Sequence, residues 1–241
     1  MKQIAHERHP GSDCGMVWRL KVLVVVCGGV LMGLEIIGSR IISPYFGHSI
    51  YVWGSLISIF LGALSLGYYI GGKVADRRPS LQLLGVIILA AGVTMLALRY
   101  ISPSICNAVY KAQLGPKLGT LVTCLALFFV PSVLLGIVSP FSVRLATIAV
   151  SNVGATAGML YALSTVGSIL GTLLVSFVMI DTMGTNAVVL TLGVSLVVVA
   201  IFAADLISLR RRPALAAILG MATIPPALLI QPSQHLGIIS K

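Results

Sequence analysis

Long apolar stretches alternate with short polar ones along the whole chain. An apolar stretch of about eighteen or more residues is long enough to cross the hydrocarbon core of a bilayer as a helix, which satisfies its backbone hydrogen bonds internally. Seven stretches have this character: 20–42, 50–72, 81–101, 118–140, 155–180, 186–208 and 214–230. The last is short and is interrupted by Pro225 and Pro226. The pattern therefore predicts an all-α, polytopic membrane bundle of six to seven transmembrane helices.

The composition agrees with a membrane protein. Of the 241 residues, 58% are hydrophobic and 9% are charged, against roughly 25% charged residues in soluble domains. The net charge of +10 does not indicate nucleic-acid binding, because the basic residues stand in short clusters between apolar stretches. The four cysteines are scattered without the spacing of a metal site or a disulfide framework, and no cofactor is expected.

The distribution of Lys and Arg predicts the orientation in the membrane. With the N-terminus in the cytoplasm, eleven basic residues fall on the cytoplasmic side and five on the other, in agreement with the positive-inside rule. We expect a cytoplasmic segment over 1–19, the helix bundle over 20–230 and a tail over 231–241, in a bacterial inner membrane. Residues 102–117 would form the longest outer loop. Seven crossings would leave the C-terminus outside.

Small residues recur at helical spacing and predict close helix contacts. They are Gly29, Gly33, Ser58, Gly62, Gly67, Gly71, Gly167 and Gly171. A weak internal repeat is also visible, because "IISPYF" at 41–46 resembles "IVSPFS" at 137–142, and 55–67 can be aligned with 164–176. Units of three helices would make an inverted 3+3 repeat, the arrangement found in each half of the major facilitator fold.

Glu35 is the main candidate for chemistry. It lies about two thirds of the way along the first apolar stretch, where an unpaired charge costs at least about 2.5 kcal/mol, so it is expected to face protein or water. Ser39 follows one turn later on the same face, and Arg40 is the next residue. A Glu–Arg or Glu–hydroxyl pair that only fixes packing is one interpretation. The other is a proton carrier, or a counter-ion for a cationic solute.

The end of the second apolar stretch suggests an electrostatic latch. The sequence "GYYIGGKVADRRPS" at 67–80 places Asp76 among basic residues. Its carboxylate could hold Arg77, Arg78 or, from another cytoplasmic loop, Arg144. Such a pair would strengthen or weaken as helices shift.

Three stretches together resemble the membrane portion of the fused major-facilitator/spermidine-synthase proteins over residues 30–210: "LEIIGSRIISPYFGHSIYVWGSLISIFLGALSLGYYIGGKVADRRPS", "LLGIVSPFSVRLA" and "GMLYALSTVGSILGTLLVSFVMIDTMGTN". "YALSTVGSILGT" is the most specific part. The resemblance implies a transporter-like membrane domain that works beside a soluble synthase-like domain. The present chain shows no nucleotide-binding loop and no nucleophile paired with a base, so it is not expected to be an enzyme by itself.

Two functions of different classes follow. The chain could handle or sense a small, cationic, polyamine-like solute, with Glu35, Ser39, Arg40, Tyr161, Ser164 and Ser168 as the binding residues and Asp76, Arg77 and Arg144 as the latch. Six or seven helices make half of a major facilitator transporter, so a homodimer, another membrane protein or a soluble synthase-like partner would complete it. Alternatively, the chain is a scaffold subunit in the membrane that transports nothing.

Overall fold

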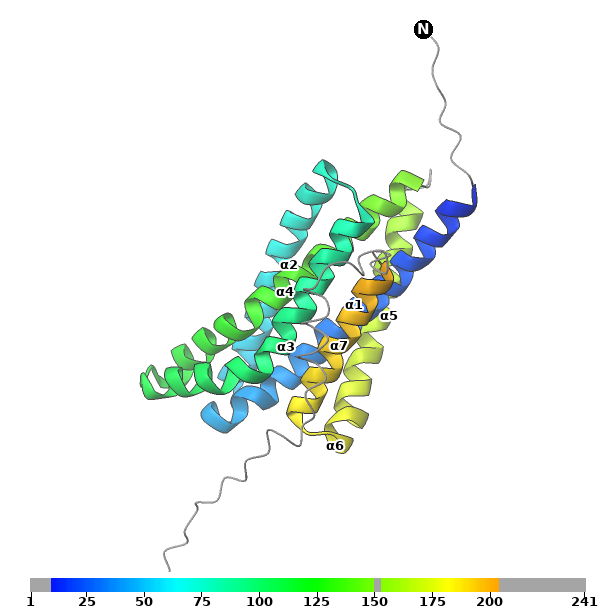
Figure 1. Cartoon of the computed structure of the whole chain (residues 1–241). Coiled ribbons are helices and arrows are strands. Elements are labelled where there is room, and N and C mark those ends of the chain that lie inside the picture. Colours follow the sequence, from blue (N-terminus) through cyan, green and yellow to red (C-terminus); the bar gives the residue numbers. More distant parts are fainter. Residues whose placement is uncertain (1–9, 150–152, 204–241) are drawn as a thin grey trace, which may run out of the picture.

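The computed structural model describes residues 10–149 and 153–203, and these residues are almost entirely helical (Figure 1). The helices are α1 (Pro10–Phe46), α2 (Ile50–Arg77), α3 (Leu81–Lys111), α4 (Gly115–Ala149), α5 (Val153–Leu174), α6 (Ile180–Thr182) and α7 (Thr185–Ala203), with a π-helical segment, η1 (Val175–Met179), between α5 and α6. The predicted all-α polytopic bundle is confirmed.

Six helical segments within the described ranges are long and apolar enough to cross a membrane. The fifth of them is continuous through α5, η1 and α6, from Val153 to Thr182. The seventh predicted stretch, 214–230, lies outside the described residues. α1 begins at Pro10, so the second half of the predicted N-terminal segment is already helical. The start of α1 and the connection between α2 and α3 lie at one end of the bundle (Figure 1).

The predicted outer loop over 102–117 is wrong. α3 continues to Lys111 despite Pro103, and α4 begins four residues later. Ser102 and Cys106 are buried at 8% and 0% exposure, so the packed face of α3 extends past the apolar stretch and holds this part helical. Positive φ angles at Gln113 (54°) and Gly115 (73°) then reverse the chain within a few residues.

The helices pack in pairs: α1 with α5, α2 with α4, and α3 with α7. Because crossings alternate in direction, the partners in the first two pairs run parallel. If the first three crossings (α1, α2 and α3) are exchanged in order with the last three (α4, α5 and α7), the same three pairs result. This symmetry agrees with the predicted inverted repeat. Large apolar side chains fill the centre, where the rings of Phe60 on α2 and Phe128 on α4 lie 5.8 Å apart.

Glycines set the distance between the paired helices. A Cβ atom on Gly29 would lie 2.9 Å from the Gly167 carbonyl oxygen, and one on Gly67 would lie 2.9 Å from the Gly136 Cα. These contacts confirm the predicted role of the small residues in α1, α5 and the inner half of α2. Ser58 and Gly62 are exposed and mark no contact within the described part of the chain, so for them the role stays a prediction. The alignment of Gly62 with Gly171 therefore does not match equivalent environments.

Candidate functional site

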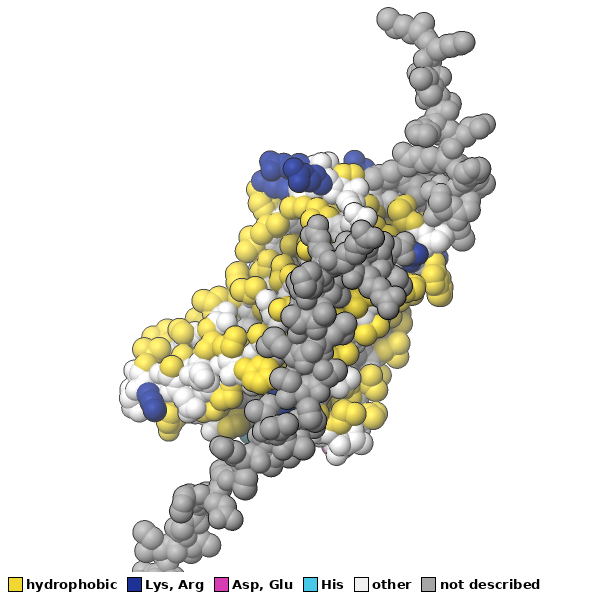
Figure 2. Space-filling model, in the orientation of Figure 1, with side chains coloured by type: hydrophobic (Ala, Val, Ile, Leu, Met, Phe, Trp, Pro, Cys, Tyr) yellow, Lys and Arg dark blue, Asp and Glu magenta, His cyan; other side chains and the backbone are white. Residues whose placement is uncertain are grey.

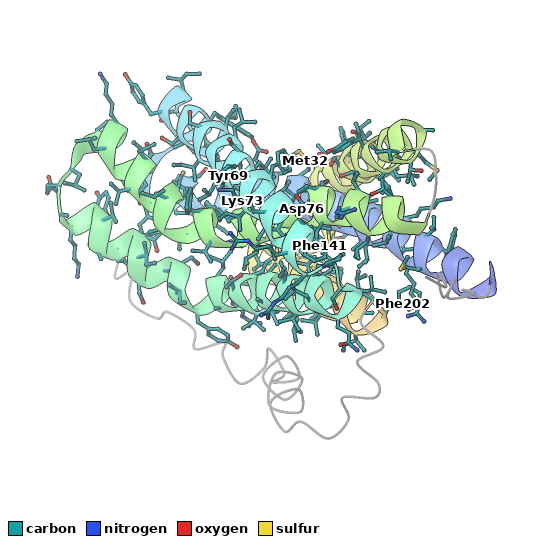
Figure 3. The ribbon with its side chains drawn as sticks, turned by 90° about the horizontal axis from the view of Figure 1, so that it is seen from above. Met32, Tyr69, Lys73, Asp76, Phe141 and Phe202 are labelled. Atoms are coloured by element: carbon teal, nitrogen blue, oxygen red, sulfur yellow. The ribbon has the colours of Figure 1, made fainter. Side chains whose placement is uncertain are left out.

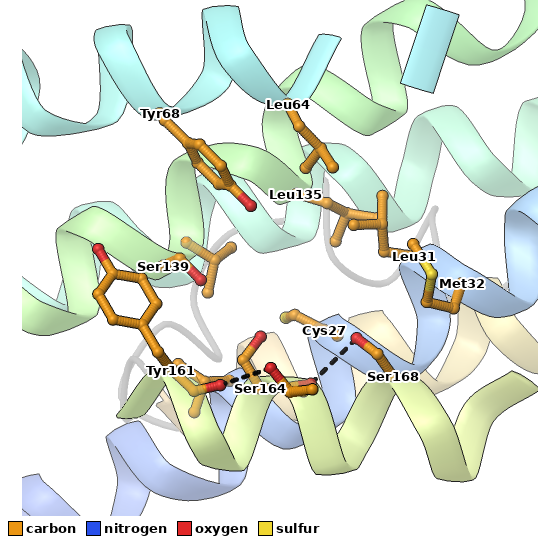
Figure 4. A pocket seen from close by; sticks show the side chains of 14 residues that line it. Cys27, Leu31, Met32, Leu64, Tyr68, Leu135, Ser139, Tyr161, Ser164 and Ser168 are labelled. Atoms are coloured by element: carbon orange, nitrogen blue, oxygen red, sulfur yellow. Dashed lines mark hydrogen bonds between the residues drawn. The ribbon is translucent and has the colours of Figure 1, made fainter. Parts of the chain in front are cut away.

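A cavity of about 190 Å³ lies between α1, α2, α4 and α5 (Figure 4). Its lining residues belong to the second halves of α2 and α4 and the middle of α1 and α5, so it lies nearer the end that holds the start of α1 and the α2–α3 connection. α1 contributes a mainly apolar wall that includes Cys27, Gly28 and Leu31. The polar lining comes from the three other helices: Tyr68 on α2, Ser139 on α4, and Tyr161, Ser164, Thr165 and Ser168 on α5. Hydroxyl groups inside a membrane bundle serve either contacts between helices or a polar binding site.

Gly28 allows α1 to approach the hydroxyl groups of α5. A Cβ atom at this position would lie 2.5 Å from the Ser164 carbonyl oxygen and 3.1 Å from the Oγ atoms of Ser164 and Ser168. Any larger residue would therefore push the two helices apart or fill the space next to the serines. The sequence indicated Gly29 as a contact residue, but Gly28 is the glycine that lines the cavity.

The hydroxyl groups on α5 have a common orientation. Thr165 Oγ1 donates to the Tyr161 carbonyl oxygen at 3.0 Å, and Ser168 Oγ donates to the Ser164 carbonyl oxygen at 3.0 Å (Figure 4). One turn further along, Thr172 Oγ1 donates to the Ser168 carbonyl oxygen at 2.9 Å. A hydroxyl group has one proton and two acceptor lone pairs. Because the backbone takes the protons, these oxygens act as hydrogen-bond acceptors toward anything in the cavity.

Three of the six predicted binding residues line this cavity, and three do not. Tyr161, Ser164 and Ser168 form part of the wall, as the sequence suggested. Glu35, Ser39 and Arg40 lie further toward the other end of α1 and are absent from the lining. The predicted single cluster is therefore divided, because the cavity lies one to two turns closer to the start of α1 than the carboxylate does.

Glu35 is half-buried, and no hydrogen bond or ion pair joins it to another described residue. The Ser39 hydroxyl donates to the Ile36 carbonyl oxygen at 2.8 Å and not to Glu35. Arg40 is exposed. The interpretation of Glu35 as one half of a fixed packing pair with Ser39 or Arg40 is thus wrong for the described part of the chain.

The helix register places Glu35 directly beyond the cavity. Leu31 and Met32 lie three and four residues after Gly28, and Glu35 lies four and three residues after them, so the four residues share one face of α1. A shallower groove of about 240 Å³ adjoins the cavity, shares Met32 with it, and continues along α5 past Thr172. Glu35 lies one turn beyond Met32 on this face.

The π-helical segment η1 packs against α1 close to the depth of Glu35. A Cβ atom on Gly33 would lie 3.0 Å from Val175 Cγ2, the first residue of η1. Single π turns inside α-helices occur frequently at functional sites. No feature of the sequence indicated this irregularity.

Ser132 adds a further polar group on α4. Its side chain is fully buried, and its hydroxyl has no hydrogen-bond partner among the described residues. Ser132, Leu135 and Ser139 are spaced at three and four residues, so they share the α4 face that lines the cavity. The polar character of this face therefore extends one turn deeper than the cavity itself.

The predicted latch is present as a single ion pair. Arg144 Nε lies 3.0 Å from Asp76 Oδ1, with the two side chains 45% and 72% exposed. Figure 3 labels Asp76. Arg77, the third predicted member, is exposed and has no ion pair within the described ranges. The pair joins the ends of α2 and α4, two helices that already pack together, and it does not cross the cavity.

Lys and Arg side chains gather around this same end of the bundle, while apolar side chains cover the visible flanks (Figure 2). Among the residues that the structure describes, no group of three His, Cys, Asp or Glu side chains could hold a metal ion. Comparison with family models, curated proteins and solved structures gives no match for this chain. The geometry of the cavity and of Glu35 therefore carries the functional argument.

Proposed function

We propose that this membrane protein binds a small, amine-bearing cationic solute, of the polyamine kind, in the cavity between α1, α2, α4 and α5. The observation that supports this proposal is the row of acceptor oxygens on α5. Thr165 and Ser168 direct their protons to the backbone, so they favour a ligand rich in N–H donors. The rings of Tyr68 and Tyr161 add faces that attract a cation.

Glu35 supports the same solute class. It is the only carboxylate of the described residues that lies away from the helix ends, and no described residue neutralises it. An unpaired carboxylate at membrane depth costs several kcal/mol, which a bound cation or a proton would offset. We therefore assign to Glu35 the role of a proton carrier or counter-ion, one helical turn beyond Met32, which lines both the cavity and the adjoining groove.

In this proposal the protein lies in the bacterial inner membrane with its N-terminus in the cytoplasm. The cavity is in the half of the bundle to which the sequence assigns eleven of the sixteen basic residues, and this half would be the cytoplasmic one. A separate soluble synthase-like protein would then supply or consume the solute on that side. The Asp76–Arg144 pair would loosen only if α2 moved against α4.

Uptake of labelled spermidine and putrescine into proteoliposomes that contain the full chain tests this proposal. We expect uptake by the native protein, loss of uptake with Glu35→Gln, and weaker uptake when Ser168→Phe fills the cavity. Asp181→Asn is the matched control, because it also removes one acid but lies at an exposed helix end. Equal uptake by the native chain and Glu35→Gln would contradict the role of the carboxylate.

A second candidate function is a scaffold subunit that transports nothing. The exposed small residues of α2, such as Ser58 and Gly62, favour it, because small residues commonly mark helix contacts in membranes. Absence of uptake by the native protein, together with intact association with another membrane protein, would support the scaffold over the transporter.

A further inference from the structure

α2 and α5 flank the open side of the cavity, and both present a face that no other described helix covers. Within one apolar 18-residue stretch of each span, 17% of the residues are buried in the fifth span and 33% in α2, against 61% in α1 and 56% in α4. Seen from above, Met32 lies between α2 and α5 (Figure 3). The half-buried Glu35 lies on the same face of α1 as Met32. The open side of the cavity therefore carries this carboxylate as well as the hydroxyl groups of α5.

The outer halves of α2 and α5, away from the basic end, differ in side-chain size. On α2, Gly54, Ser58 and Gly62 form an exposed row, and Cβ atoms on the two glycines would meet nothing within 4 Å. At the corresponding depth of α5, Ile169 and Leu173 are 55% and 47% exposed. A shallow groove on one helix thus matches a ridge on the other.

The inner halves show the reverse arrangement. Here α2 projects Tyr69, which is 62% exposed, while α5 carries Gly158 and Ala162 on its uncovered side. A Cβ atom on Gly158 would meet nothing within 4 Å. The ridge is now on α2 and the groove on α5.

These depths can be compared because the cavity links the two helices. Tyr68 on α2 and the residues from Tyr161 to Ser168 on α5 line the same space. Moving outward by six residues on each helix reaches Gly62 on α2 and residues 167–174 on α5, since each residue adds 1.5 Å along a helix. Ile169 therefore lies at a depth between those of Ser65 and Gly62, and Leu173 lies near the depth of Ser58. On the inner side, Ala162 lies near the depth of Tyr69.

We infer that a second copy of this chain covers the α2–α5 face, with α2 of each copy against α5 of the other. A twofold rotation about the membrane normal preserves depth, so one rotation brings both ridges onto both grooves. The groove on the outer half of α2 then receives the ridge on the outer half of the second copy's α5. The ridge on the inner half of α2 enters the groove on the inner half of that same helix. Lipid would instead leave the hydroxyl groups and Glu35 against hydrocarbon, which is costly.

The contact has a consequence for the cavity. The open sides of the two cavities face each other across the twofold axis, so each copy completes the wall of the other. This inference goes beyond the proposed function and does not depend on it, because the size match holds whether or not a solute is bound.

Disulfide trapping in membranes tests the inference. Two differently tagged full-length chains, one with Ser65→Cys and one with Ile169→Cys, are co-expressed after the four native cysteines are changed to alanine. We expect oxidation to join the two tags in one band at twice the 25.3 kDa mass, because a disulfide forms only when the Cα atoms lie within about 7 Å. The control pair is Val86→Cys with Val198→Cys, on exposed positions of α3 and α7.

A mass measurement of the uncrosslinked native chain in lipid nanodiscs is the second test. A dimer is expected, and Gly62→Phe should shift it toward the monomer by filling the groove, whereas Val86→Phe should not. A monomeric native chain, or a disulfide in the control pair without one between positions 65 and 169, would overturn the inference. Trapping without solute uptake would leave this dimer in place and contradict only the proposed function.

Discussion

Gly71 and Gly72 are adjacent on α2 but face different surroundings, so they offer a matched test of the packing between α2 and α4. A Cβ atom on Gly71 would lie 2.9 Å from the Ile137 Cα, 2.9 Å from the Ile137 carbonyl oxygen and 2.9 Å from Pro140 Cγ. A Cβ atom on Gly72 would meet nothing within 4 Å. Two of the three atoms that oppose Gly71 belong to the backbone of α4 and cannot rotate away.

The expected magnitude follows from the difference between the two variants. Replacing glycine by alanine favours a helix by up to about 1 kcal/mol at both positions, so this contribution cancels. Forcing a methyl group against the backbone of α4 costs about 1–3 kcal/mol. Gly71→Ala should therefore be less stable than Gly72→Ala by about 1–3 kcal/mol, and each kcal/mol corresponds to about 2–4 °C in the unfolding midpoint of a chain of this length.

Buried thiols provide the assay. Cys27, Cys106 and Cys124 are buried, so a thiol-reactive dye reaches them only when the bundle opens on heating in detergent. Cys14 is changed to serine in every variant to remove a separate signal. Equal midpoints for the two alanine variants would refute the argument that backbone contact at Gly71 sets the separation of α2 and α4.

Three further predictions use the same structure. Asp76→Asn and Arg144→Gln should each lower stability by no more than about 1 kcal/mol, and a double-mutant cycle should give a coupling below this value, because the pair is exposed to solvent. Ser132→Ala should leave the unfolding midpoint unchanged or raise it, since it removes a buried hydroxyl without a described partner; a drop of several degrees would indicate an important bond there. A membrane-impermeant thiol reagent should label His48→Cys in intact cells and Arg78→Cys only after permeabilisation, and the opposite pattern would contradict a cytoplasmic N-terminus.

Hydrophobicity predicted the helices well because crossing a bilayer is a requirement on length and composition. It failed between residues 102 and 117, where Ser102, Pro103 and the lysines lower the hydropathy while tertiary packing keeps α3 helical. Hydropathy reports how well a segment is accommodated by lipid, and it contains no information on which helices pack against each other. The same limit explains Gly62, whose spacing resembles a packed position but whose neighbour is not another described helix.

The candidate site was predicted only in part. Tyr161, Ser164 and Ser168 were identifiable because they repeat at helical spacing within one apolar stretch. Tyr68 and Ser139 were missed because they join the cavity only through the packing of α2 and α4 against α1 and α5, which spacing within one helix does not reveal. The sequence identified Glu35 as unusual but placed Ser39 and Arg40 beside it, whereas the register directs it toward Met32.

The fifth crossing can lose one residue without rotating its side chains only at the π turn, Val175–Met179. This segment accommodates one residue more than an α-helix would, so deletion of a single residue there would restore regular α-helix and preserve the rotational phase of the residues on both sides. Deletion of one residue of α5 before Thr165 would instead rotate the later side chains by about 100° relative to the earlier ones. It would carry Thr165 and Ser168 away from the cavity. Insertions and deletions among distant relatives should therefore be concentrated in these five residues.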